Sequence, residues 1–287
     1  YGIVKYYDLE VTHTKDNKYK KPSKSKEKID ENVEAVSGFN PMYWKLELPS
    51  GYNASDFKVT YFEFDKRVQP FFYKDSLDDA LVFEAYEVEN STSKSKYIRS
   101  NMREQMQPGS NDVNWTMKTG GVLETEFQVT KMSKDEKGKY HRTLLIQVDG
   151  RTSEKDTKAL GLKKPVSMPF VKIFWQNGVI RVKRRVLKDE TLVGDALLSK
   201  KSWKEESADY YSKKVDFEKV KLRLELKKGR IEIRINDEKP IVFADFNVVQ
   251  WYFENYFTVG NYLQTRDFGA HSIVKYYDLN VSHGKKK

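Results

Sequence analysis

The chain has 287 residues, 52 Lys and Arg against 42 Asp and Glu, a net charge of +10 and no cysteine. This length suits one large all-β domain. The lack of cysteine excludes disulfides and thiolate chemistry, and the four histidines show no zinc-type spacing, so we expect neither a metal site nor a cofactor.

The positive charge favours a polyanionic partner. Residues 1–35 hold 8 Lys against 7 acidic residues, so most of the excess belongs to the rest of the chain. Long-range attraction then raises the local concentration of nucleic acid, anionic membrane or acidic polysaccharide. No nucleic-acid motif accompanies the charge, and no apolar run is long enough to span a bilayer. We therefore expect no nucleic-acid and no membrane partner.

The first segment in chain order is one copy of an internal repeat. Residues 2–13 match residues 272–283 almost position for position. We interpret residues 1–13 as a remnant of an upstream sister domain in a tandem protein; the alternative is that both copies are strands of one sheet. Residues 14–37 are polar and predict a linker, because they cannot bury enough surface to offset the entropy of ordering. One folded domain at 38–284 and a basic tail at 285–287 complete the chain.

Residues 97–104 predict a strand with a polar face. Successive side chains of a strand point to opposite sides, so Arg99, Asn101 and Arg103 share one face, while the apolar residues between them face a core. Two guanidinium groups and an amide therefore line one surface.

Residues 143–150 repeat this design. The apolar positions that we expect to face the core are Leu144, Ile146 and Val148. Gln147 and Asp149 then lie side by side on the outward face. If the two strands are neighbours in a sheet, their polar faces form a common surface.

Regular alternation continues through the middle of the chain. Residues 171–182, with an Asn177-Gly178 turn, and residues 220–235, with a turn at 227–229, predict β-hairpins. Helical periodicity is confined to 76–80 and to a stretch around 197–208. Many strands joined by turns favour a two-sheet antiparallel sandwich or jelly roll.

Residues 256–264 form the last strand with two distinct faces. Tyr256, Thr258, Tyr262 and Gln264 share one face, and apolar residues occupy the other. A phenol at Tyr262 and an amide at Gln264 are thereby added to the polar surface of the other two strands.

These three segments resemble the motifs of the family 7 polysaccharide lyases, the alginate lyases. R-S-N-M-R-E at 99–104 is similar to R-S-E-L-R-E, Q-V-D at 147–149 to Q-I-H, and residues 256–264 to Y-F-K-A-G-x-Y-x-Q, in the family's order. The resemblance covers roughly residues 38 to 284. It implies a β-jelly roll whose concave sheet holds a substrate groove, which the polar loops at 151–164 and 188–214 would flank.

The resemblance also implies an activity and its residues. A uronate lyase removes the proton beside the sugar carboxylate and expels the glycosidic oxygen, so the carboxylate must be neutralised. Arg99 and Gln147 match the neutralising positions, and Tyr262 matches the catalytic tyrosine. The residues expected to bind substrate are Arg103, Asn101, Gln264 and Tyr256.

The chain departs from the family at three positions. Asp149 replaces the histidine, Asn101 replaces a glutamate and Thr258 replaces a lysine. We expect Asp149 either to bind Arg99 or Arg103, or to act in catalysis as a base with its pKa raised by burial.

These departures bear on the substrate. Loss of the histidine favours mannuronate-type linkages over guluronate, and leaves open glucuronan or another polyuronate. It also leaves open a carbohydrate-binding module without activity. We expect a secreted or extracellular monomer, with the periplasm as an alternative, that acts on an anionic polysaccharide without a metal and can be part of a larger multidomain chain.

Overall fold

The computed structural model describes residues 39–48, 68–86 and 97–284. The chain divides into two units, residues 1–34 and 35–287, and every described residue belongs to the second. The predicted strand remnant at 1–13, the linker at 14–37 and the basic tail at 285–287 lie outside the described residues.

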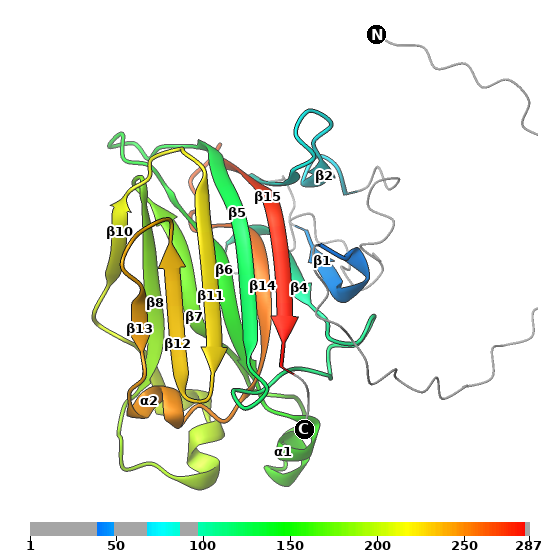
Figure 1. The fold of residues 1–287 in the computed structure, drawn as a ribbon, viewed down its shortest axis with the longest axis vertical. Coiled ribbons are helices and arrows are strands. Elements are labelled where there is room, and N and C mark those ends of the chain that lie inside the picture. The colour runs from blue at the N-terminus through cyan, green and yellow to red at the C-terminus, as the bar shows by residue number, and fades with distance from the viewer. Residues whose placement is uncertain (1–38, 49–67, 87–96, 285–287) are drawn as a thin grey trace, which may run out of the picture. The chain divides into compact units, whose positions relative to one another are not determined.

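Two antiparallel sheets make up the described domain (Figure 1). The first sheet contains, in spatial order, β1 (Trp44–Glu47), β4 (Ile98–Glu104), β14 (Glu254–Leu263), β6 (Arg142–Arg151), β7 (Ser167–Gln176), β8 (Val179–Leu187) and β10 (Tyr210–Lys214), with β9 (Trp203–Glu205) paired to β8. The second contains β13 (Ile241–Phe243), β12 (Arg230–Ile235), β11 (Val220–Lys227), β5 (Gly121–Met132), β15 (His271–His283), β3 (Leu81–Tyr86) and β2 (Phe72–Lys74).

The apolar faces of both sheets meet in one core. Phe257 and Ile173 of the first sheet and Phe127 and Leu224 of the second are fully buried there. Sequence neighbours often lie apart: β4 pairs with β1 and β14, and β5 pairs with β11 and β15. This two-layer arrangement with long crossings is a β-jelly roll, which confirms the predicted fold class.

Both predicted hairpins are present, and the backbone conformation of their two-residue turns explains why the chain reverses there. Asn177 and Gly178 have φ angles of 51° and 80°, and Lys228 and Gly229 have 49° and 75°. Two successive residues with positive φ match the right-handed twist of the strands that they join. In β11 every second residue is buried, as the alternation of the sequence predicts.

The helix predictions were wrong at both places. Residues 76–78 form a turn and residues 79–80 have no regular structure, and residues 197–208 contain the end of one 3₁₀ helix, a second one and β9. The helical elements that the structure has are α1 (Glu154–Ala159), α2 (Phe246–Val249) and the 3₁₀ turns η1 (Pro41–Tyr43), η5 (Gly194–Leu198) and η6 (Lys200–Ser202). Both α-helices are shorter than two full turns, so no helical period can appear in the sequence. Their N-caps, Ser153 and Asp245, accept backbone N–H groups instead.

No helix within the described ranges is long and apolar enough to cross a lipid bilayer.

Candidate active site

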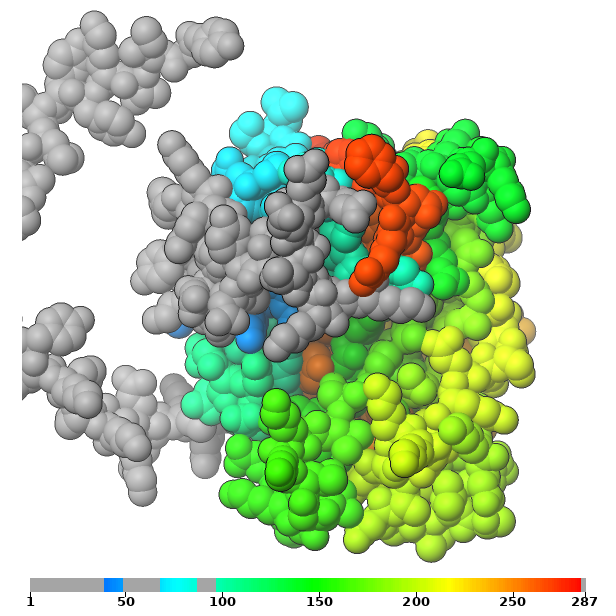
Figure 2. Space-filling view, turned by 180° about the vertical axis from the view of Figure 1, so that it is seen from behind, coloured from blue at the N-terminus to red at the C-terminus, as the bar shows by residue number. Residues whose placement is uncertain are grey.

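A cavity of about 380 Å³ lies on the outer face of the first sheet. Its lining comes from β1, β4, β14, β6 and β7, together with Tyr97 just before β4 and Gln264 just after β14. Figure 2 views the molecule from this side, and orange atoms of β14 are visible at the bottom of a hollow there. No residue of the polar loops at 151–164 and 188–214 lines the cavity.

The strand register brings the motif residues together. Tyr262 of β14 lies opposite Arg99 of β4, and Thr258 of β14 lies opposite Gln147 of β6. On the other side Gln147 lies opposite Lys172 of β7. Directly opposite side chains on one face are about 5 Å apart at Cβ. Residues far apart in the sequence therefore share one polar surface.

Seven of the eight predicted site residues line the cavity: Tyr262, Arg99, Gln147, Asp149, Arg103, Gln264 and Tyr256. Asn101 does not. Its side chain is buried, and its Oδ1 has no hydrogen-bond partner. Because Asn101 lies opposite Gly260 on β14, it belongs to the floor beneath the cavity.

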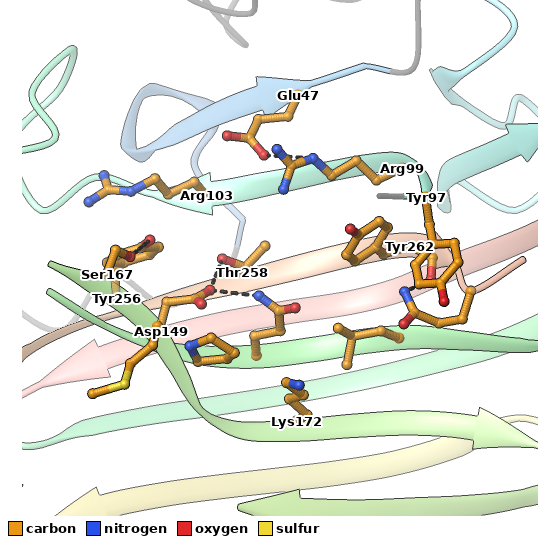
Figure 3. A pocket seen from close by; sticks show the side chains of 15 residues that line it. Glu47, Tyr97, Arg99, Arg103, Asp149, Ser167, Lys172, Tyr256, Thr258 and Tyr262 are labelled. Atoms are coloured by element: carbon orange, nitrogen blue, oxygen red, sulfur yellow. Dashed lines mark hydrogen bonds and ion pairs between the residues drawn. The ribbon is translucent and has the colours of Figure 1, made fainter. Parts of the chain in front are cut away.

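Arg99 lies between an acid and a phenol (Figure 3). Its Nε is 3.3 Å from Oε2 of Glu47 on β1, and its Cζ is 5.6 Å from the centre of the Tyr262 ring. The closest contact of this ion pair is at Nε, and the terminal Nη1 and Nη2 groups carry the guanidinium's parallel N–H bonds. Two parallel N–H groups suit a carboxylate. Tyr97 meets the Tyr262 ring edge to face from the other side.

Arg103 is held by the protein itself. Its Nη1 donates to the carbonyl of Glu104 and to Asn111 Oδ1, and its Nη2 donates to the Asn111 carbonyl and to Asn114 Oδ1, at 2.8 to 3.1 Å. Its Cζ stacks 3.8 Å from the centre of the Tyr256 ring. Four of its five N–H donors are thus engaged. Arg103 is therefore built into the wall of the cavity.

Tyr256 is a half-buried phenol on the wall of the cavity. Burial is the main cause that raises the pKa of Tyr256 to about 12, and the charge of Asp149 adds to it. Its hydroxyl lies 3.3 Å from Ser167 Oγ. Tyr256 consequently remains protonated at neutral pH and is unsuited to accept a proton.

Asp149 does not bind either arginine, contrary to one of the two expectations for it. Arg99 forms its ion pair with Glu47, and Arg103 is bound by asparagines. The Oδ2 atom of Asp149 instead accepts the Gln147 Nε2–H at 2.8 Å and the Thr258 hydroxyl at 2.9 Å. Burial raises the pKa of Asp149, as the other expectation assumed, while these two hydrogen bonds oppose the shift; the role of Asp149 as a base stays a prediction.

One core prediction was wrong, at Leu144. Leu144 lines the cavity, and Leu145 packs in the core instead. The register between β6 and β7 shifts by one residue between Leu144 and Ile146. A bulge of this kind reverses the alternation of the strand locally, which a period of two cannot predict.

Two charged residues of the cavity were missed. Glu47 occupies the edge strand β1, and Lys172 lies on β7 next to Gln147. The alternation in residues 171–175 places Lys172 on a polar face, and this signal was present in the sequence. For Glu47 the four-residue strand offers too short a pattern.

Comparisons with known proteins agree with this geometry. The family model for alginate lyases matches residues 39–283. Among curated proteins, no sequence matches the chain. Alginate lyase A1-II', a member of polysaccharide lyase family 7, has a similar structure, with a TM-score of 0.65 and 21% identity over 86% of this chain and 97% of that one. A variant of A1-II' was solved in complex with a substrate written GGMG.

Two further structures are similar. The alginate lyase PA1167 from Pseudomonas aeruginosa has a TM-score of 0.56 and 18% identity, over 85% of this chain and 99% of that one. A truncated AlyQ with CBM32 and alginate lyase domains has a TM-score of 0.59 and 18% identity, over 85% of this chain and 61% of that one. At these identities the likeness shows the fold alone.

Proposed function

This chain belongs to the alginate lyase family, since the family match spans nearly the whole described domain, and we propose that this polysaccharide lyase cleaves alginate by β-elimination in the cavity of the first sheet. One observation carries the proposal: Arg99, Gln147 and Tyr262, from three adjacent strands, line the same cavity. They supply a cation, an amide and a phenol to one sugar unit.

The first task of the site is to neutralise the uronate carboxylate. A proton on the carbon beside an ionised carboxylate is very weakly acidic, and its removal places further charge on the carboxylate oxygens. The two terminal N–H groups of Arg99, Nη1 and Nη2, are suited to bind these oxygens in a bidentate manner. Gln147 adds an amide from β6, on the other side of β14, and Lys172, which also pairs with Glu205, lies opposite Gln147 on β7.

The second task is to move the proton, and we assign it to Tyr262. Its ring is half-exposed in the cavity and lies beside the Arg99 guanidinium. The Tyr262 phenol can then return a proton to the leaving glycosidic oxygen when both lie on one face of the sugar. Gln264 is fixed by its amide, which donates to the Tyr262 carbonyl at 3.0 Å, and would orient the sugar.

We further propose mannuronate-type linkages as the preferred substrate. The support is the replacement of the family histidine by Asp149, which leaves Tyr262 as the group that moves protons. The substrate bound to A1-II' is written GGMG, so the comparison does not favour one uronate. The proposed site of action on such a polymer is extracellular. AlyQ carries a CBM32 domain beside its lyase domain, which supports a multidomain parent chain.

The test measures the ultraviolet absorbance of the unsaturated uronate product. Polymannuronate, polyguluronate and glucuronan are supplied separately, with and without a metal chelator. We expect absorbance to rise on polymannuronate and to be insensitive to the chelator. In the Tyr262→Phe variant kcat should fall by about 10²–10⁴-fold, the usual contribution of a positioned acid and base.

A matched control and the rival readings complete this experiment. Tyr252→Phe makes the same change at an exposed tyrosine outside the cavity lining and should retain activity. Absorbance that rises only on glucuronan would change the substrate but keep the lyase. Binding of the polymers without any absorbance change would favour the inactive binding module.

A further inference from the structure

Asp149 is an uncompensated carboxylate in a cavity proposed to bind a polyanion. Its side chain is 7% exposed. Within the part of the chain that the structure describes, no cation forms an ion pair with it, and both recorded partners of Oδ2 are neutral donors, Gln147 and Thr258. A buried charge without a counter-charge is costly to maintain.

Several charged or titratable groups face Asp149 from the surrounding strands. They are Glu47 on β1, Arg99 and Arg103 on β4, Tyr256 on β14, Lys172 on β7 and Arg185 on β8. None of the cations in this set forms an ion pair with Asp149, although Arg99 and Arg185 are near enough to interact with its charge. Arg99 pairs with Glu47, Lys172 with Glu205, Arg103 with Asn111 and Asn114, and Arg185 with the carbonyl of Pro169. Glu47 adds a second negative charge.

The hydrogen bond from Gln147 couples Asp149 to the ligand. The Gln147 amide is planar, and its nitrogen faces Asp149 at 2.8 Å. A uronate carboxylate that accepts the second N–H of the same nitrogen would lie roughly 5 Å from the Asp149 carboxylate, as two ordinary hydrogen bonds from one nitrogen require. Two ionised carboxylates at that separation in a buried site disfavour each other, and one of them takes up a proton.

We propose that Asp149 is a positioning residue. The uronate carboxylate binds Gln147 only when the Asp149 carboxyl is neutral, so that binding of the polymer takes up one proton from solvent. The neutral carboxyl can donate to the Gln147 carbonyl oxygen, which turns both amide N–H groups toward the sugar. The inference rests on the proposed function, because it assumes that Gln147 contacts the substrate carboxylate. In turnover the pH dependence then falls on KM rather than on kcat.

The burial of Asp149 supports this mechanism. Burial raises the pKa of Asp149, the bonds from Gln147 and Thr258 lower it, and the neighbouring Glu47 raises it again. The group is thus already biased toward protonation before the substrate adds its own negative charge.

The experiment measures proton uptake on binding without turnover. A mannuronate tetramer is titrated calorimetrically into the Tyr262→Phe protein at several pH values, in buffers of different ionisation enthalpy. Where free Asp149 is ionised, we expect uptake of about one proton and a Kd that rises about tenfold per pH unit. In Tyr262→Phe with Asp149→Asn the uptake should vanish and Kd should no longer depend on pH.

A second variant keeps Asp149 in place. Thr258→Val removes one donor to the ionised carboxylate, so the pH range of proton uptake should move upward; a purely structural role for Thr258 would leave that range unchanged. Proton uptake that persists in the Asp149→Asn protein, or Kd that rises strongly in that variant at every pH, would overturn the inference. Proton-linked binding together with a wild-type chain that releases no unsaturated uronate would sink the lyase proposal and leave this inference standing.

Discussion

Glu104 at the end of β4 and His283 at the end of β15 form a largely buried ion pair. Oε1 of Glu104 is 2.5 Å from Nε2 of His283, and its Oε2 accepts the Trp115 indole N–H and the backbone N–H of Phe257. Burial alone would lower the pKa of His283, but the charge and hydrogen bond of Glu104 outweigh it, and the net pKa is raised. On β4, Arg99 and Arg103 thus point to the cavity, while the next residue, Glu104, points to the interior and has a structural role.

This pair predicts a pH-dependent stability. A histidine with a raised pKa contributes fully below its ordinary pKa, about 6.5, and the contribution is lost as pH rises through the raised value. We expect His283→Gln to lower the free energy of unfolding by about 1–3 kcal/mol at pH 6, and by less at pH 9. Urea unfolding of both proteins at pH 6, 7.5 and 9 measures the difference. A constant difference across this range would contradict a proton-linked pair.

The two motif arginines should respond differently to the same substitution. Lys keeps the charge but loses the planar fork of donors. Arg103→Lys breaks up to four internal hydrogen bonds and should lower the free energy of unfolding by about 1–3 kcal/mol. Arg99→Lys should change the free energy of unfolding by no more than about 0.5 kcal/mol, but it should lower kcat/KM. Each variant is the control for the other in denaturant unfolding and in the absorbance assay. Equal loss of stability in both would refute the distinction.

At the scale of elements, β14 determines the geometry of the site. Against β4 its register is continuous, but against β6 it contains one extra residue between Val259 and Tyr262. Gly260 lies in this bulge with a φ of 144°. The bulge lets Asn261 enter the core while Tyr262 keeps its place opposite Arg99.

Gly260 is therefore expected to tolerate no side chain. A Cβ there would lie 2.5 Å from the Asn101 Cα and 2.6 Å from the Ser100 carbonyl oxygen, and these backbone atoms of the neighbouring strand cannot yield. We expect Gly260→Ala to lower the free energy of unfolding by about 2–4 kcal/mol. Gly138→Ala is the control, because its φ is also positive, 75°, while its surroundings are empty. Thermal or urea unfolding of both variants measures the difference. An equal loss of stability in both would mean that the close approach of Gly260 to β4 does not limit the side chain there.

At the scale of the whole molecule, the second sheet supports the site through buried polar groups. Asn261 accepts hydrogen bonds from Thr143 and Ser272 and donates to the carbonyls of Phe83 and Ser272. Tyr276 of β15 accepts the Gly260 N–H at 3.1 Å. These bonds join β14 to β3 and β15 across the core. The floor of the cavity is consequently held by both layers of the sandwich.

The sequence by itself determined the strands, the jelly-roll class and the polar faces that carry Arg99, Gln147 and Tyr262. It did so because alternation within a strand is a local property, with a period of two that each segment shows on its own. Turn residues such as Asn177-Gly178 are local in the same way. The two short α-helices escaped prediction because fewer than two turns display no period.

Only the tertiary structure decided which groups of the polar surface are available to a ligand. It placed Glu47 beside Arg99, bound Arg103 to asparagines of the following loop, and gave Asp149 the neutral donors Gln147 and Thr258 as hydrogen-bond partners. A bulge also exchanged Leu144 for Leu145 in the core. These outcomes depend on pairing between segments far apart in the chain, and on the burial that such pairing creates, which no local pattern encodes.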